Sequence, residues 1–159
     1  MQKDISDINV KKLELQDLDR FIDLIHLFED VFEMKHFTMP PSQHLEKLLA
    51  RTDFYVFTAF KDDQLVAGLT AYILEQYYSE KQLAYIFDLA VARAYQRQGI
   101  GKKLIQAINK YCREKGFEEV FVQADRIDDH AVNFYRSTQP SEEEDVIHFY
   151  YLLDDEKNK

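Results

Sequence analysis

The sequence predicts one domain of the α/β (α+β) class, in which helices flank a mixed β-sheet. Segments with the apolar spacing of a helix alternate along the chain with segments rich in β-branched and aromatic residues. An apolar strand, a loop with two glycines and an amphipathic helix follow one another over residues 85–108. No repeat or low-complexity linker divides the 159 residues, a length that suits a single domain (1–159) with its own core.

The N-terminal half is predicted to contain one strand, two helices and a β-hairpin. Apolar residues from Leu18 onward recur at the spacing of one helical face. Pro41 suits the first turn of a second helix, because the amide hydrogen that proline lacks would have no acceptor there. Two segments of aromatic and β-branched residues, joined by the turn residues 61–64, form the hairpin. The expected bounds are 9–14 for the first strand, 18–34 and 41–49 for the helices, and 54–60 and 65–74 for the hairpin strands.

The C-terminal half is predicted to complete the sheet. The strand at 83–91 is apolar on both faces, which places it centrally. The helix that follows Gly99 ends at Gly116, a residue suited to a helix C-terminus, and this crossover makes the strand at 119–124 parallel to the strand at 83–91. Asp128 or Asp129 caps a short helix, and residues 146–153 are expected as a last strand.

The composition narrows the classes of function. The chain has 29 acidic and 20 basic residues and a net charge of −9, which disfavours nucleic acid as a partner and is compatible with a cationic small molecule, although acidity often serves solubility alone. No apolar run approaches the ~18 residues that span a bilayer, and the N-terminus lacks the core of a signal peptide, so we expect a cytoplasmic protein without a membrane partner. The single cysteine, Cys112, excludes an intramolecular disulfide and a multi-cysteine metal site, and no bound metal is expected.

The loop 96–101 is the first candidate site. Amides in a loop and in the first turn of a helix have no helical acceptor, and the helix dipole adds positive potential, so such a loop can bind a phosphate. Gly99 and Gly101 are two of only four glycines in the chain, and glycine lets the backbone approach a pyrophosphate without a Cβ in the way. A Rossmann site fits poorly, because its three glycines follow a first βα turn and need an acidic residue about 20 positions later. A Walker Gly-Lys-Ser/Thr sequence is absent.

Four aspartates form the second candidate. Asp88 is a lone carboxylate in an apolar strand, where an unpaired charge is costly. Its partner is either a backbone amide or arginine of the protein, or the ammonium group of a substrate, in which case Asp88 can act as a base directly or through water. Asp125 follows the strand at 119–124 on the side where α/β sheets bind ligands. Asp125, Asp128 and Asp129 together can bind ammonium groups, unless the last two only cap the helix.

Two motifs resemble those of the GNAT superfamily of N-acetyltransferases. Gln96-x-x-Gly99-x-Gly101, between an apolar strand and a helix, resembles the acetyl-CoA signature of that family. Asp128-x-x-Ala131-x-x-Phe134-Tyr135 resembles the family helix that ends in Phe-Tyr, and the spacing between the two motifs and the order of the predicted elements are also similar. The resemblance implies the GNAT fold, with a mixed central sheet of about six to seven strands, about four helices, and a cleft between the strand at 83–91 and the strand at 119–124.

A narrower resemblance is to the aminoglycoside 3-N-acetyltransferase type I group within that superfamily. Its most specific part is the string Gln123-Ala-Asp125 with Asp128-Asp-x-Ala-Val132, and the segments at 85–91, 97–100 and 146–149 are also similar. Residues 136–145 depart from the group, because a Lys-x-Gly and a short turn are replaced by a longer loop without glycine. That loop would border the acceptor site, so the departure puts the identity of the acceptor in question.

The resemblance implies an acetyl-CoA-dependent N-acetyltransferase. Its acceptor would be an amine of a polycationic small molecule, an aminoglycoside at the 3-N position, and the enzyme would be a cytoplasmic homodimer with a role in antibiotic resistance. The alternatives are a polyamine, another metabolite amine or a protein amine as acceptor, or a non-catalytic sensor that binds acyl-CoA on the same fold.

The resemblance also implies roles for individual residues. Tyr135 matches the tyrosine proposed to protonate the CoA thiolate, a transfer that suits the acidity of a phenol, although this side chain can also simply pack. Asp88 is expected to be the base. The backbone of residues 89–91 is expected to pair with the pantetheine arm like an added strand, and an amide there can polarise the thioester carbonyl. The residues expected to bind acetyl-CoA are Leu89, Ala90, Val91, Gln96, Arg97, Gln98, Gly99, Ile100, Gly101, Lys102 and Asn133.

Overall fold

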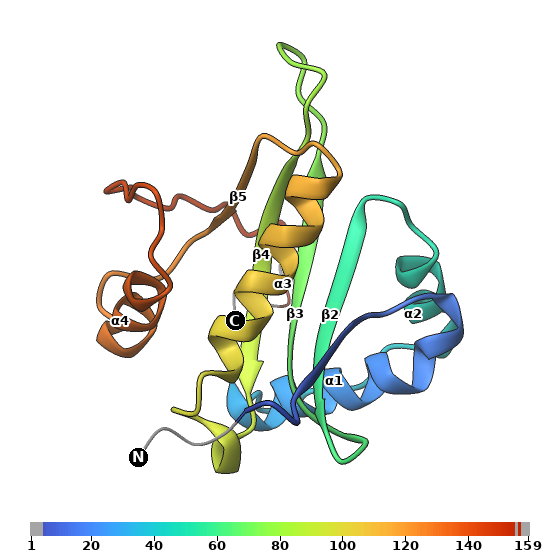
Figure 1. The fold of residues 1–159 in the computed structure, drawn as a ribbon. Helices are drawn as coiled ribbons and strands as arrows, with labels where there is room; N and C mark the ends of the chain where they lie inside the picture. The colour runs from blue at the N-terminus through green and yellow to red at the C-terminus, as the bar shows by residue number, and fades with distance from the viewer. Residues whose placement is uncertain (1–4, 155, 157–159) are drawn as a thin grey trace. The chain divides into compact units, whose positions relative to one another are not determined.

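A computed structural model describes residues 5–154 and residue 156 of the chain. These residues form two compact units, Met1–Ala124 and Asp125–Lys159 (Figure 1). No helix in the described part of the chain is both long and apolar enough to cross a membrane.

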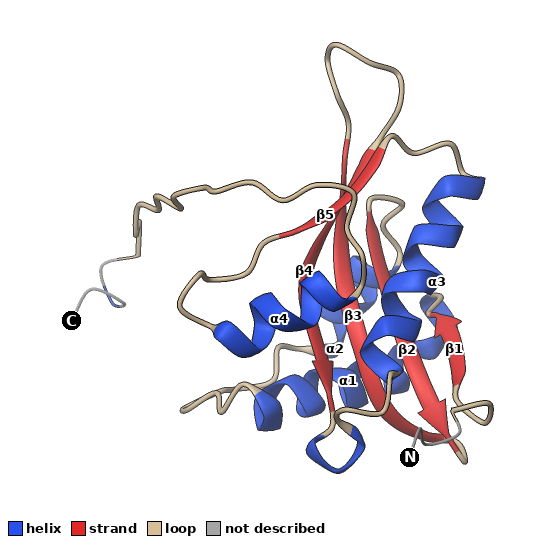
Figure 2. Ribbon diagram, turned by 60° about the vertical axis from the view of Figure 1, so that its left-hand side comes forward, coloured by secondary structure: helices blue, strands red, loops and turns tan. Residues whose placement is uncertain are grey.

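The first unit is built around a mixed sheet with the strand order β1-β2-β3-β4-β5 (Figure 2). The strands are β1 (Asn9–Lys12), β2 (Phe54–Lys61), β3 (Gln64–Leu74), β4 (Leu83–Val91) and β5 (Glu119–Val122). β1 to β4 are antiparallel neighbours, whereas β5 pairs in parallel with β4. The mixed α/β sheet and the parallel crossover predicted from the sequence are therefore confirmed.

Three helices cover the two faces of this sheet, as Figure 1 shows. They are α1 (Leu18–Val31), α2 (Ser42–Leu49) and α3 (Ile100–Glu114), and short 3-10 turns occupy Leu15–Asp17 and Arg93–Tyr95. Phe54 and Val56 of β2 belong to one buried cluster with the apolar residues of α1 and α2. Tyr55 and Phe57 point the other way and contact the ring of Tyr111 on α3. Because side chains alternate along a strand, α3 lies on the face opposite α1 and α2.

The close approach of α1 to the sheet depends on Gly68. A Cβ built on this residue of β3 would lie 2.4 Å from Cδ1 of Leu24, a fully buried residue of α1. The helix packs over this position and its buried cluster reaches Ala90 of β4. Gly68 thus lets α1 lie directly on the central strands, where it contacts β3 and β4.

The second unit contains the helix α4 (Asp129–Ser137), and no other helix or strand longer than a single 3-10 residue is present in its described residues. The predicted last strand at 146–153 is wrong, since these residues form no ladder and their apolar side chains are exposed. A strand is stable only beside a partner strand, and no described segment of the unit supplies one. The sheet therefore has five strands, fewer than the six to seven expected. The helix expected to end near 34 ends at Val31, and the strand expected at 119–124 ends at Val122.

Candidate functional site

The C-terminal half of β4 has one free edge within the first unit. β4 and β5 pair only from Leu83–Glu119 to Ile86–Val122, and β4 continues to Val91. On its other side β4 stays paired with β3 up to Val91 opposite Ala67. No described strand pairs with the β5-side edge of residues 87–91. An extended chain can add to such an edge through backbone hydrogen bonds, and the predicted cofactor residues Leu89, Ala90 and Val91 lie on it.

A β-bulge interrupts β4 where this free edge begins. Thr70 lies opposite Asp88 and Ala71 lies opposite Ile86, so Phe87 is the extra residue of β4. A bulge changes the direction of the side chains beside it and increases the local twist of the strand. The sequence contains no glycine near this position and did not predict the bulge.

Asp88 is half-buried beside the bulge. Within the described part of the chain, no hydrogen bond or ion pair reaches its carboxylate. Burial raises the pKa of Asp88 above the usual value, because desolvation disfavours the ionised form and no positive group compensates it. The sequence left open whether a protein group or a ligand pairs with Asp88. In the described structure the protein offers no such partner.

The loop between β4 and α3 has the backbone geometry of an anion site. Gly99 is the N-cap of α3 and has φ 86°, and Arg97 has φ 61°, so two residues of one tight loop are in the left-handed region. The amides of residues 97–102 donate no hydrogen bond within the described chain. The first amide that does so is that of Lys103, which donates to the Gly99 carbonyl. Consecutive unpaired amides at the start of a 15-residue helix suit a pyrophosphate.

Two glutamines hold this loop in shape. Gln96 donates through Nε2 to the carbonyl of Val91 at 3.0 Å, and Gln98 donates through Nε2 to the carbonyl of Ala94 at 3.2 Å. Lys102 and Arg97 are exposed and free of recorded partners in the described structure. Lys103 instead donates to the carbonyls of Ile5 and Ile8. The groups that remain for an anion are therefore the loop amides and two exposed cations.

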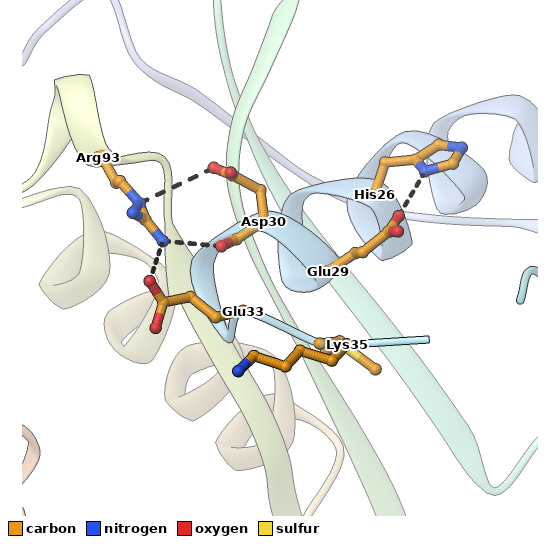
Figure 3. Close-up of a pocket in the computed structure, with 7 residues that line it drawn as sticks. His26, Glu29, Asp30, Glu33, Lys35 and Arg93 are labelled. Carbon is orange, nitrogen blue, oxygen red and sulfur yellow. Dashed lines mark hydrogen bonds and ion pairs between the residues drawn. The ribbon is translucent and has the colours of Figure 1, made fainter. Parts of the chain in front are cut away.

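An open pocket of about 700 Å³ lies at the end of α1 (Figure 3). Arg93 donates to the Asp30 carbonyl at 2.8 Å, and its guanidinium lies 3.9 Å from the carboxylates of both Asp30 and Glu33. His26 lies 3.2 Å from Glu29. These exposed ion pairs contribute little to stability, but they connect the end of α1 to the turn that follows β4. The pocket is lined by His26, Glu29, Asp30, Glu33, Met34, Lys35 and Arg93.

The predicted residues after 124 belong to the second unit. Asp128 caps α4 by accepting the Ala131 amide at 3.0 Å, and Asp125 accepts the Ile127 amide at 3.1 Å. The helix-cap interpretation of Asp128 is thus confirmed, while Asp129 lies in the first turn. Tyr135 is half-buried with its ring 4.9 Å from that of Phe134, and Asn133 is exposed.

Two arginines of the second unit bind its acidic loop. Arg136 donates to both carboxylate oxygens of Glu143, and Arg126 pairs with Asp145. The hydrogen bonds between Arg136 and Glu143, and then their opposite charges, raise the pKa of Arg136 and lower the pKa of Glu143. Part of the negative charge in the unusual loop 136–145 is therefore already paired.

The structure brings the predicted residues together in two groups. Residues 88–91 and 96–102 lie along β4 and its loop in the first unit, and Asp125 to Tyr135 lie on and before α4 in the second. Cys112 is 1% exposed, and burial raises the pKa of its thiol to about 11, so this side chain belongs to the core. Among the described residues no group of three or more metal-ligating side chains occurs.

Sequence reasoning missed a partly exposed aromatic cluster on β3, β4 and β5. It consists of Tyr72, Tyr85, Phe87 and Phe121, whose rings contact one another in succession. A signal was present, because Tyr85 and Phe87 alternate along one strand beside Asp88. The strand pairing that joins them to Tyr72 and Phe121 was not visible in the sequence.

Comparison with known proteins agrees with this arrangement. A sequence profile of the acetyltransferase (GNAT) family matches residues 21–139. The search of curated proteins finds no match.

Solved structures give closer relatives. An aminoglycoside acetyltransferase from an uncultured soil metagenomic sample, meta-AAC0020, solved with trehalose, has 60% identity and a TM-score of 0.93, over 94% of this chain and 99% of that chain. The same protein solved with sisomicin gives 60% identity and a TM-score of 0.92, over 93% and 97%. A second soil-metagenome aminoglycoside acetyltransferase has 30% identity and a TM-score of 0.85, over 92% and 99%.

Proposed function

Because the chain belongs to the GNAT acetyltransferase family, we propose that this acetyl-transferring enzyme acetylates an aminoglycoside, with the 3-amino group as the acceptor. The observation that carries the proposal is the 60% identity, over nearly the whole chain, to an aminoglycoside acetyltransferase solved with sisomicin. The net charge of −9 suits a polycationic acceptor. The proposal includes a cytoplasmic homodimer that confers resistance to the antibiotic.

Acetyl-CoA, the cosubstrate of the family, would supply the acetyl group as a thioester. Within the first unit, the amides of residues 97–102 and the cations Arg97 and Lys102 suit its pyrophosphate. The free edge of Leu89–Val91 suits the pantetheine arm, which has amide groups that can pair with a strand. Gln96 and Gln98, predicted as cofactor residues, support this assignment by holding the loop rather than by free polar groups.

The acceptor must lose a proton before its nitrogen can attack. Asp88 is assigned the role of the base, since its carboxylate has no protein partner in the described structure and its pKa is raised toward the working pH. It would first bind the ammonium group and then take the proton, directly or through one water. Tyr135 keeps the assignment as the acid for the departing thiolate, which rests on its motif position alone. Asp125, Asp128 and Asp129 keep theirs as acceptor ligands, with Asp128 also serving as the helix cap.

The test is an acetylation assay with a panel of acceptors. The purified protein is incubated with acetyl-CoA and, separately, sisomicin, spermidine and a lysine-containing peptide, and thiol release is followed together with the product mass. We expect product with sisomicin, and NMR of that product should place the acetyl group on the 3-nitrogen. Product with peptide or spermidine alone would overturn the aminoglycoside assignment. Acetyl-CoA binding without any product would point to a sensor.

A further inference from the structure

We propose that Tyr72, Tyr85, Phe87 and Phe121, here called the aromatic platform, bind a ring of the acceptor by stacking beside Asp88. The inference rests on the function proposed above and adds the residues that recognise the acceptor. All four side chains, and Asp88, belong to the first unit.

The rings form a continuous row from the core to the surface. Phe21 of α1 contacts Phe54, Phe54 contacts Tyr72 at 5.2 Å, and Tyr72 contacts Phe87 at 5.5 Å. Phe87 contacts Tyr85, and Tyr85 stacks on Phe121 with ring centroids 4.8 Å apart and an angle of 7°. Exposure rises from 5% at Phe54 to 37% at Tyr72 and 57% at Phe87, and Tyr85 and Phe121 are half-buried. The platform therefore opens to solvent mainly at Phe87 and Tyr72.

The bulge in β4 brings this surface to Asp88. Thr70, opposite Asp88, lies two residues before Tyr72, so the two side chains of β3 point to the same face of the sheet. Ala90, two residues after Asp88, belongs to the cluster under α1, which places Asp88 on that face as well. In a regular strand, Phe87 and Asp88 would point to opposite faces of the sheet. Here the ring of Phe87 instead contacts Tyr72 and Tyr85, on the face of Asp88. Because Phe87 is the extra residue, an aromatic ring and a carboxylate adjacent in sequence share one face.

The aromatic platform and the Asp88 carboxylate together favour a cationic ring as the ligand rather than an apolar partner. An apolar protein surface laid over the platform would further desolvate Asp88, which has no partner in the described structure, at a substantial cost. A ring that carries ammonium groups suits both the carboxylate and the aromatic rings. One ammonium group can pair with Asp88, while the C–H groups of the ring and a second ammonium group lie on the aromatic faces. The Tyr85 hydroxyl, which donates to Oε1 of Gln123 at 3.2 Å, adds polar groups at the rim.

The first test is the kinetics of Phe87 variants with sisomicin. We expect Phe87→Ala to raise KM for sisomicin about 2- to 30-fold and to leave KM for acetyl-CoA unchanged. Phe87→Leu should behave like Phe87→Ala, whereas Phe87→Tyr should keep the wild-type KM, because stacking needs a π face and not only an apolar side chain. Tyr77→Ala is the matched control, since Tyr77 is an aromatic residue that is 98% exposed and contacts only Tyr78 among the rings.

The second test does not require activity. The chain has no tryptophan, so Phe87→Trp introduces a single tryptophan into the platform, and its emission can be excited selectively beside the ten tyrosines. We expect its emission to change in a saturable way on titration with sisomicin, and to change much less with glucose, a neutral sugar. An emission unaffected by saturating sisomicin would overturn the platform even if the wild type proved inactive.

The outcomes separate the platform from the proposed function. If the wild type acetylates sisomicin but Phe87→Ala leaves its KM unchanged, the platform is wrong and the proposed function stands. If the wild type forms no product with any aminoglycoside, the proposed function fails, and the emission of Phe87→Trp decides the platform. If Phe87→Ala converts a dimer into a monomer in light scattering, the platform is an interface between copies and the inference is overturned.

Discussion

The glycine loop at 96–101 follows β4, whereas the aromatic platform lies on β3, β4 and β5, and the two present different parts of the chain to a ligand. The loop presents backbone amides in a conformation set by Gly99 and Arg97, and its glutamine side chains serve the loop itself. The platform presents side chains, and three of its four residues, Tyr72, Tyr85 and Phe121, pair through their backbone with neighbouring strands. The proposed role of the loop depends on its backbone conformation, whereas the proposed role of the platform depends on which side chains occupy it.

This difference suggests how one fold can keep one cosubstrate and vary its acceptor. Substitutions on the exposed faces of β3 and β4 would change the proposed acceptor surface without altering the loop. Conversely, changes in the loop should affect the acetyl donor for every acceptor alike. The predictions below test this division, beginning with the residue nearest the boundary.

Asp88→Asn should have the largest effect. We expect kcat/KM for sisomicin to fall by about 10²- to 10⁴-fold, as is typical for loss of a general base, and the carboxyl inflection to disappear from the pH profile of kcat/KM. In the wild type that inflection should lie above the usual carboxyl value, because burial raises the pKa of Asp88. Asp63→Asn, in the exposed β2–β3 turn, is the matched control. An unchanged pH profile in Asp88→Asn would remove Asp88 from the base role.

The same variant should gain stability at neutral pH. A carboxyl whose pKa is higher in the folded than in the unfolded state binds its proton more tightly when folded, so the free energy of unfolding falls as pH rises from the ordinary carboxyl pKa through the raised one. Asn has no proton to lose, so Asp88→Asn escapes this fall. Denaturant unfolding measured near pH 4 and at pH 7 should show that the free energy of unfolding of the variant increases relative to that of the wild type as pH rises. A loss of stability at pH 7 would mean that an unseen partner holds the carboxylate.

Gly99→Ala should raise KM for acetyl-CoA about tenfold. Gly99 has φ 86°, and a Cβ there would meet only Cδ1 of Ile5, at 3.5 Å, so the expected change is a backbone rearrangement rather than a clash. Gly116→Ala is the control, because Gly116 has φ 82° with nothing within 4 Å of a Cβ. Both variants should lose about 1–2 kcal/mol of unfolding free energy, but only Gly99→Ala should change KM. Equal KM values would show that the loop conformation does not matter for the donor.

Lys102→Ala should have a smaller effect than Gly99→Ala. Lys102 is an exposed cation in the first turn of α3, and an exposed ion pair with a phosphate is worth about 0.5–1 kcal/mol, or a 2- to 5-fold rise in KM for acetyl-CoA. Added salt should reduce the difference between variant and wild type. Lys110→Ala, an exposed residue of the same helix far from the loop, should leave KM unchanged.

Arg136→Ala should have the smallest effect. Arg136 and Glu143 form a bidentate pair within the second unit, and both side chains are exposed, with fractional exposures of 57% and 61%. Solvent screens such a pair, so we expect no measurable change in thermal midpoint or in KM for acetyl-CoA. A clear change in KM for sisomicin alone would instead connect the loop 136–145 with the acceptor.

Much of the first unit could be predicted because its signals are local. The apolar stripe of α3, its start after Gly99 and its end at Gly116 are read from spacing and glycine chemistry. β4 was placed correctly from its apolar character on both faces. The loop was predicted as an anion site because amides at a helix start have no acceptor, whatever the surrounding fold.

The last strand shows where a local pattern misleads. Residues 146–153 are rich in aromatic and β-branched residues, which favour a strand, yet they remain unpaired in the described structure. Propensity describes how well a residue suits a strand, but the hydrogen bonds come from a neighbour that the segment itself does not specify.

The sequence by itself determined the class of fold, the place of the glycine loop between β4 and α3, and the conspicuous position of Asp88. Only the tertiary structure decided that Phe87 is the extra residue of a bulge, that Asp88 has no protein partner in the described chain, and that four aromatic rings from three strands meet beside it. The physical reason is the range of the interactions. Helix periodicity and glycine conformation act over a few residues, whereas strand register joins residues as far apart as Tyr72 and Phe121, and no local pattern encodes which of them will touch.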